Sequence, residues 1–168
     1  QADHRPGRVA AMTEPTSAGT TAAERDQQAV LDFLDGSRFG VAKGGKRIDT
    51  HASMVFLGGD TALKIKRAVR LPFLDYSTLE KRKRACEEEL NVNAGNAPEL
   101  YRRVIAITRN SDGMLEIDGS GTPVEWALHM RRFRDADLLS AVAARGGIDR
   151  ALALRIADAV AAAHERAE

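Results

Sequence analysis

The sequence is poor in the residues that build disulfide frameworks and metal sites. Among its 168 residues there is one cysteine, Cys86, which cannot form an internal disulfide bond or a cysteine-rich metal site. The four histidines are scattered, and none has the paired spacing of a metal-binding motif. The sequence therefore predicts no metal site in this chain. The histidines are His4, His51, His129 and His164.

Long apolar runs and a clear excess of one charge are also missing. No segment approaches the roughly 18 to 20 apolar residues that span a bilayer, and residues 1–21 lack the apolar stretch of a secretory signal. We therefore expect a cytoplasmic protein with no membrane partner. With 25 basic and 24 acidic residues the net charge is +1, which disfavours a dedicated nucleic-acid-binding protein. The basic run at residues 81–84 is interpreted as a solvated face.

The first part of the chain changes from a polar tail to a helix. Residues 1–21 are rich in Ala, Thr, Pro and Gly without periodicity, which predicts a disordered tail. A short helix is expected over residues 22–35, because apolar residues recur there with helical spacing. These residues are Val30, Leu31 and Leu34.

Short apolar segments separated by turns predict an antiparallel sheet. Residues 53–57 and 61–66 flank the turn Gly58-Gly59-Asp60, which is a good hairpin signal. Antiparallel strands interrupted by a single helix indicate the α+β class rather than a parallel βαβ fold. Further strands are expected at residues 101–108, 114–118 and 124–130.

Three helices are expected after the hairpin. Ser77-Thr78-Leu79-Glu80 matches a capping box, so a helix should start there and run to about Asn93. Two more are expected at residues 137–145 and 149–166, with Asp149 as the N-cap of the second. Its apolar face should consist of Leu152, Ile156 and Val160, which repeat at every fourth position.

The strand at residues 61–66 carries the first candidate site residues. Strand alternation places Ala62, Lys64 and Lys66 on one face. A lysine between apolar neighbours on a hairpin strand is a candidate phosphate ligand, as in the kinase strand where a small residue lies two positions before the lysine. The alternative is an edge strand whose surface lysines prevent aggregation. The hexapeptide alone leaves both interpretations open.

The acidic run of the following helix supplies the candidate partner. A phosphate-binding lysine needs a carboxylate from the next helix to hold it. On a helical wheel, Glu87 and Glu89 flank the apolar face on opposite sides, so either could reach a lysine, whereas Glu88 points away. Alternatively, the acidic run is a solvated patch that pairs with residues 81–84 at i,i+4 spacing. The apolar face is defined by Leu79, Cys86 and Leu90.

Several blocks of sequence in combination carry a family resemblance. They are similar to bacterial proteins of the aminoglycoside-phosphotransferase-like, protein-kinase-like fold family, many of which carry a further C-terminal P-loop ATPase domain. The resemblance covers about residues 28–168. Its most distinctive parts are Ala62-Leu63-Lys64-Ile65-Lys66-Arg67 and Met130-Arg131-Arg132-Phe133. The remaining blocks are 48–57, 69–80, 86–90 with Asn93, 97–101 and 125–127.

The resemblance implies the small lobe of a kinase-like enzyme. The lobe, an antiparallel sheet plus one helix, would occupy residues 22–130, followed by a hinge and the first two helices of a large lobe at 131–168. Neither His129 nor His164 is followed two positions later by the aspartate of a catalytic loop. We therefore expect this chain to stop before that loop and to contain no catalytic residue of its own.

The resemblance also implies roles for individual residues. Lys64 would contact the α- and β-phosphates of ATP, with Lys66 as the alternative. Glu89 would pair with that lysine, and Glu87 stays open as its replacement. Ala62 would lie against the adenine.

Two backbone segments complete the implied nucleotide site. Residues 50–53 would replace the glycine-rich phosphate loop, using backbone amides and the hydroxyl groups of Thr50 or Ser53. His51 would either join them or be a structural hydrogen-bonding residue. Met130, Arg131 and Arg132 would form the hinge that offers backbone groups to the adenine edge.

These expectations describe the ATP-binding lobe of a small-molecule phosphotransferase. ATP and Mg²⁺ are the cofactors expected for the complete protein, and the phosphate acceptor would be an unidentified hydroxyl-bearing small molecule. The alternative is a non-catalytic, kinase-like nucleotide-binding or protein-interaction module. An exposed lobe interface would also favour self-association.

Overall fold

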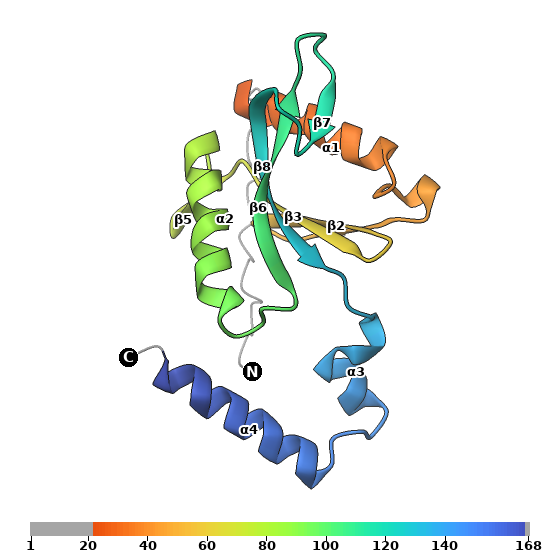
Figure 1. Cartoon of the computed structure of the whole chain (residues 1–168), viewed down its shortest axis with the longest axis vertical. Helices are drawn as coiled ribbons and strands as arrows, with labels where there is room; N and C mark the ends of the chain where they lie inside the picture. Colours follow the sequence, from red (N-terminus) through yellow and green to blue (C-terminus); the bar gives the residue numbers. More distant parts are fainter. Residues whose placement is uncertain (1–21, 167–168) are drawn as a thin grey trace, which may run out of the picture.

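The computed structural model describes residues 22–166, so the tail predicted at residues 1–21 lies outside the described residues. Its central element is a curled, six-stranded antiparallel sheet in the order β1-β2-β3-β8-β6-β7 (Figure 1). Helices are added on both faces, so the predicted α+β class is confirmed. The strands of this sheet are β1 (Lys46–Asp49), β2 (Ser53–Gly58), β3 (Thr61–Lys66), β6 (Tyr101–Arg109), β7 (Leu115–Ile117) and β8 (Thr122–Arg131).

The predicted hairpin, β2 and β3, lies between β1 and β8 in the sheet. β2 and β3 pair from Ser53 opposite Lys66 to Gly58 opposite Thr61. Gly59 in the turn has a φ of +61°, a conformation that favours glycine. β3 also pairs with β8 along its other side, so the edge-strand interpretation of residues 61–66 was wrong. The true edge on this side is β1, which was not predicted.

Helix α1 (Ala22–Gly36) covers one face of the sheet and closes the hydrophobic core. Val30, Leu31 and Leu34 are buried, as their spacing predicted. They pack with inward-facing residues of β2, β3, β6 and β8. The sheet residues in this core are Met54, Phe56, Leu63, Ile65, Ile105, Ile107 and Ala127.

Helix α2 (Leu79–Ala94) lies on the other side of the sheet, against β8, β6 and β3 (Figure 1). The predicted capping box starts one residue too early. Thr78 is the N-cap, and its side chain accepts a hydrogen bond from the Lys81 N–H at 3.3 Å. Ser77 instead donates its hydroxyl and its N–H to Asp75 Oδ1, so its side chain is not free to cap the helix.

A small hairpin, not predicted, connects β3 to α2. It consists of β4 (Arg70–Leu71) and β5 (Leu74–Asp75). Asp75 pairs with Lys81 at 2.6 Å, which fixes the hairpin to the first turn of α2. The pKa of Asp75 is lowered by its hydrogen bonds with Lys81 and Ser77.

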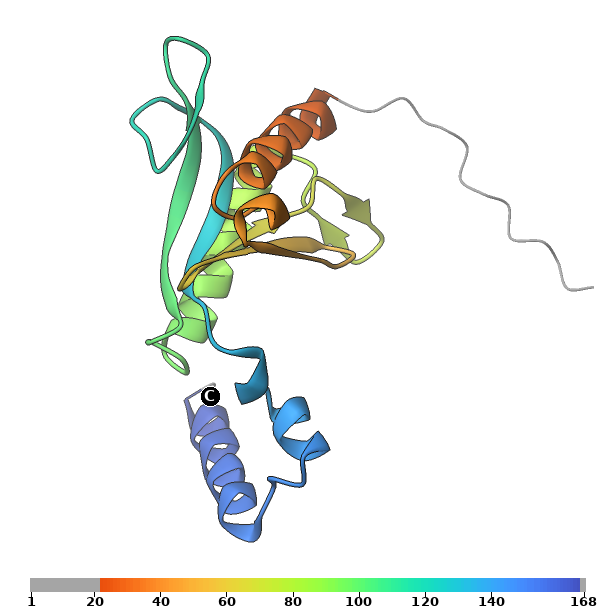
Figure 2. The same ribbon diagram turned by 90° about the vertical axis from the view of Figure 1, so that its right-hand side faces the viewer.

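The C-terminal helices extend away from the sheet (Figure 2). The helix predicted at 137–145 is split into a 3-10 turn, Asp135–Asp137, and α3 (Leu139–Ala144), because Leu138 is extended with a ψ of 134°. Helix α4 (Arg150–Glu165) is capped by Asp149, which accepts from the Leu152 N–H at 2.7 Å as predicted. Its apolar face is not buried: Val160 is 48% exposed.

Within residues 22–166, none of the helices combines the length and the apolar character needed to cross a membrane.

Candidate nucleotide site

A cavity of about 410 Å³ lies between the sheet and the segment that leads to α3. The hairpin strands contribute one wall, and the end of β8 with its continuation contributes the other. Seven of the predicted site residues line it: Thr50, Ser53, Ala62, Lys64, Met130, Arg131 and Arg132. The remaining lining residues are Ile48, Val55, Leu57, Leu100, Tyr101, Phe133, Asp135 and Leu138.

Glu89 of α2 holds both candidate lysines of β3 behind this cavity. Lys64 Nζ lies 2.7 Å from Glu89 Oε1, and Lys66 donates to Glu89 Oε2. The structure therefore brings Lys64, Lys66 and Glu89 together. The other carboxylates of the run pair along their own helix, Glu87 with Lys83 and Glu88 with Arg84. Glu89, and not Glu87, is thus the partner of the β3 lysines.

The ionisation of this cluster follows from burial and pairing. Burial alone would lower the pKa of Lys66, but its hydrogen bond with Glu89 and the negative charge there outweigh burial and raise the pKa. Burial would likewise raise the pKa of Glu89, and the two lysines overcome it and lower the pKa. Tyr101 lines the cavity beside Glu89, and its pKa is raised by burial and by that carboxylate. The pairing therefore favours the ammonium form of Lys66 and the carboxylate form of Glu89.

The turn between β1 and β2 contributes Thr50 and Ser53 to the cavity lining. Thr50 Oγ1 donates to Ser53 O at 2.9 Å and accepts from the Ser53 N–H at 3.0 Å, so the Thr50 hydroxyl holds the turn together. Ser53 Oγ and the N–H groups of His51 and Ala52 have no hydrogen-bond partner among residues 22–166. The imidazole of His51 is exposed and does not line the cavity. Ser53 Oγ is therefore the group of this turn that a ligand in the cavity could use, because His51 and Ala52, whose two amides are free, do not line it.

The predicted hinge has most of its backbone donors occupied. The Arg131 N–H donates to Leu100 O at 2.8 Å, and the Arg132 N–H donates to Asp60 O at 2.7 Å. The next N–H group, that of Phe133, has no acceptor in the part of the chain that the structure describes. A ligand edge could therefore meet the Phe133 N–H more readily than those of the predicted hinge residues.

The charges around the cavity favour an anionic ligand. Lys64, Arg131 and Arg132 line it, against one lining carboxylate, Asp135. Lys64 and Arg131 pair with Glu89 and Glu99, which do not line the cavity. Asp135 is itself paired with Lys46 at 2.9 Å, and this hydrogen bond lowers its pKa. An excess of one sign of charge in a cleft raises the local concentration of ligands of the opposite sign.

A buried polar network that the sequence did not reveal holds α2 against the sheet. Arg82 Nε donates to both carboxylate oxygens of Glu125, at 2.9 and 3.0 Å, and both side chains are buried. Gln27 of α1 donates to Glu125 Oε2 at 2.7 Å and to Lys66 O at 2.8 Å. β3 pairs with β8 only as far as Ala127, so Glu125 lies past the end of β3, within reach of both helices. The prediction of a solvated face at residues 81–84 was wrong for Arg82.

Arg82 and Glu89 are seven residues apart, about two helical turns, and therefore lie on the same side of α2. Cys86, between them, is also buried and is the free cysteine of the chain. The pairing of Arg82 with Glu125 fixes the face of α2 that delivers Glu89 to the lysines. The signal that could have indicated this role is the single acidic residue, Glu125, within the apolar strand at residues 124–130.

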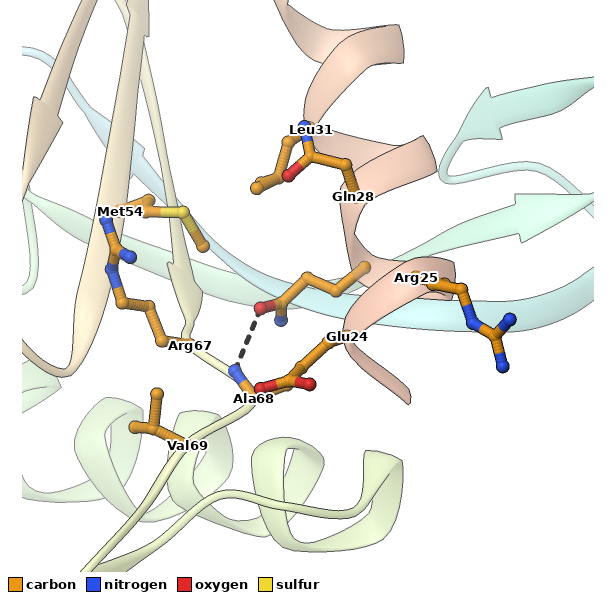
Figure 3. Close-up of a pocket in the computed structure, with 9 residues that line it drawn as sticks. Glu24, Arg25, Gln28, Leu31, Met54, Arg67, Ala68 and Val69 are labelled. Atoms are coloured by element: carbon orange, nitrogen blue, oxygen red, sulfur yellow. Dashed lines mark hydrogen bonds between the residues drawn. The ribbon is translucent and has the colours of Figure 1, made fainter. Parts of the chain in front are cut away.

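A second cavity, of about 530 Å³, lies between α1 and the end of β3 (Figure 3). The hydrogen bond drawn there is donated by the Ala68 N–H to Gln27 Oε1 at 2.8 Å. The cavity is larger, but none of the predicted site residues lines it. Its lining residues are Glu24, Arg25, Gln27, Gln28, Leu31, Met54, Arg67, Ala68 and Val69.

Among residues 22–166, no group of three or more His, Cys, Asp or Glu side chains is arranged to hold a metal ion.

Comparison with known proteins shows a distant and partial similarity. The chain is 32% identical over 120 residues to the uncharacterized proteins Rv2004c and MT2060 of Mycobacterium tuberculosis and Mb2027c of Mycobacterium bovis. The match covers 71% of this chain and 22% of each relative, so the chain spans about a fifth of their length. No family model matches the chain. No solved structure matches it either.

Proposed function

We propose that this chain is the nucleotide-binding lobe of an ATP-dependent phosphotransferase acting on a hydroxyl-bearing small molecule. The observation that carries the proposal is the position of Lys64, whose side chain lines the cavity while its ammonium group pairs with Glu89 of the following helix. Kinase-fold enzymes hold the phosphates of ATP with this arrangement of strand lysine and helix glutamate. The resemblance of residues 62–67 and 130–133 to a kinase-like family supports the same function.

The cavity suits a nucleotide in size and chemistry. Its volume of about 410 Å³ falls in the range of ordinary small-molecule sites. We place the base between Leu57, Ala62 and Met130, with its polar edge toward the Phe133 N–H. The phosphates would then extend to Lys64 and to the Ser53 hydroxyl of the β1–β2 turn. Phosphate oxygens are strong acceptors, and lysine and backbone N–H groups are their usual donors.

Magnesium would enter with the nucleotide as Mg-ATP, where it neutralises phosphate charge. The cavity lining includes one carboxylate, Asp135, which is already paired with Lys46. We therefore propose no metal ligand from residues 22–166. Binding of the phosphate acceptor and the transfer step are proposed for the complete protein.

Isothermal titration of Mg-ATP into the chain and into Lys64→Ala tests the nucleotide site. Loss of a charged hydrogen bond to phosphate should weaken binding by at least about tenfold. Lys81→Ala is the matched control, because Lys81 also pairs with a carboxylate, Asp75, but does not line the cavity. Equal affinities for wild type and Lys64→Ala, or no binding by wild type, would refute this function.

The exposed apolar side chains of the C-terminal helices support a second candidate, an interaction module. Leu139, Leu154 and Val160 are 48%, 50% and 48% exposed. Several such residues on neighbouring helices form the kind of surface that associates with another protein. Sedimentation velocity at increasing protein concentration should then show self-association, and the double variant Leu154→Ser/Val160→Ser should reduce it. A monomer at every concentration would argue against the interaction module.

A further inference from the structure

Strand β3 extends beyond the point where one of its neighbours leaves it. β8 pairs with β3 only as far as Ile65 opposite Ala127, and the next residues of β8 pair with β6 alone. On its other side, β3 stays paired with β2 as far as Lys66. Lys66 is buried, and buried backbone groups without a hydrogen-bond partner are costly. The end of β3 therefore needs another partner on the side that β8 has left.

A side chain of α1 takes the place of the missing strand. Gln27 Nε2 donates to Lys66 O at 2.8 Å. Gln27 Oε1 accepts from the Ala68 N–H at 2.8 Å (Figure 3). The Arg67 N–H, between these two groups, donates to Ala52 O on the β2 side. Because successive residues of a strand point their backbone groups to alternate sides, Lys66 O and the Ala68 N–H both face the side that β8 has left. The amide of Gln27 thus continues the ladder.

The same amide reaches the carboxylate that fixes α2. Gln27 Nε2 also donates to Glu125 Oε2 at 2.7 Å, and the Gln27 residue is 6% exposed. Glu125 pairs with Arg82, which lies two helical turns before Glu89 on α2. Gln27 is therefore joined to the strand that carries the two lysines and to the carboxylate that fixes the helix of their partner.

We propose that Gln27 is a positioning residue of the nucleotide site, which fixes the end of β3 relative to α2 so that Lys64 and Lys66 stay paired with Glu89. The inference rests on the proposed function. Lys66 is the last residue of β3, and Lys64 lies two positions before it on the same face. A strand end that loses its partner opens locally, which would move both ammonium groups relative to Glu89. A binding site whose supporting contacts leave it about 1 Å too loose loses its function.

Titration of Mg-ATP into Gln27→Met tests this role. Methionine keeps the length of the side chain and removes all three hydrogen bonds, so binding should weaken by about tenfold. Leu31→Ala is the matched control, because Leu31 lies about one turn further along α1 and is buried in the core. This control also destabilises the fold, but Leu31 makes no hydrogen bond to β3 or Glu125. The affinity of Leu31→Ala should therefore stay within about twofold of wild type.

Two further readouts separate positioning from stability alone. In the Lys64→Ala background, Gln27→Met should weaken Mg-ATP binding by less than about threefold, since the lysine to be positioned is already gone. The side-chain ammonium NMR signals of Lys64 and Lys66 should change in Gln27→Met and stay unchanged in Leu31→Ala. The signal of Lys81, whose ion pair lies at the first turn of α2, should stay unchanged in both variants.

The outcomes distinguish this inference from the proposed function. Where wild type binds Mg-ATP, three results would overturn the role of Gln27 and leave the nucleotide site intact. These are unchanged affinity in Gln27→Met, equal losses in Gln27→Met and Leu31→Ala, and the same loss with and without Lys64. Failure of wild type to bind Mg-ATP would overturn the site and this inference with it.

Hydrogen exchange in wild type decides the question if Gln27→Met does not fold. Coupling between two sites is reciprocal, so a site that depends on Gln27 should in turn hold Gln27 more firmly when it is occupied. Mg-ATP should therefore slow the exchange of the Gln27 side-chain NH₂ protons. An exchange rate that Mg-ATP leaves unchanged would refute the proposal.

Discussion

Replacement of Arg82 by methionine should remove much of the stability of this fold. The substitution keeps the length and apolar stem of the side chain but deletes the guanidinium. It leaves Glu125 with Gln27 as its remaining side-chain partner in a fully buried position. The damage comes from this stranded charge rather than from lost packing.

The magnitude can be worked from burial. Removing one partner of a buried ion pair typically costs about 3–5 kcal/mol. The total free energy of unfolding of a domain is usually about 5–15 kcal/mol, so Arg82→Met should lose a large fraction of it. With a urea dependence of about 2 kcal/mol per molar, the unfolding midpoint should fall by about 2 M.

Urea unfolding followed by circular dichroism measures this loss. Arg84→Met is the matched control, because Arg84 lies two positions away on the same helix and forms an exposed pair with Glu88 at 3.7 Å. An exposed pair of this kind contributes less than about 0.5 kcal/mol. Arg82→Met together with Glu125→Leu should regain part of the loss, since both charges are gone. Equal, small effects of Arg82→Met and Arg84→Met would refute the claim that the buried pair holds α2.

Three further predictions concern single residues. Burial raises the pKa of Cys86 to about 12. A thiol reagent at pH 8 should therefore label Cys86 at least about a hundredfold more slowly in the native chain than in urea, and rapid labelling of the native chain would contradict its burial. The folded-state pKa of Glu89 is below its ordinary value of 4.5, so its ionised form stabilises the fold above pH 4.5 and this stabilisation is lost as the pH falls through the folded pKa. The difference in unfolding free energy between wild type and Glu89→Gln should therefore shrink from pH 7 to pH 3. A difference that stays constant with pH would argue against this ionic role of Glu89. Gly40→Ala should lower the melting temperature by several degrees, because the added Cβ would overlap Asp35 O. Gly36→Ala should change the melting temperature little, because a Cβ at Gly36 would have no atom within 4 Å. Similar shifts for the two variants would show that the loop at Gly40 can rearrange.

The elements that sequence could predict are those with a strong local signal. The hairpin at residues 53–66 has two apolar segments around a glycine turn, and α1 has an apolar stripe with helical spacing. The helical wheel limited the partner of the lysines to Glu87 or Glu89. The choice of Glu89 depends on how α2 is rotated against the sheet, which local spacing does not determine.

The features that sequence missed depend on contacts distant along the chain. β1 has the sequence Lys46-Arg47-Ile48-Asp49, a polar segment that becomes a strand by pairing with β2. Arg82 belongs to a basic run whose other members are half-buried or exposed, and its burial follows from its pairing with Glu125, 43 residues away. Because Glu125 becomes accessible to both helices only where β3 ends, no local pattern around residue 82 could indicate the pair.

An NMR titration with Mg-ATP tests most directly whether a nucleotide binds at Lys64. Chemical-shift changes of backbone amides should be largest at Ser53, Ala62, Lys64 and Phe133, which line the cavity. Shifts that gather instead around Ala68 in the second cavity, or no shifts at millimolar Mg-ATP, would contradict the account.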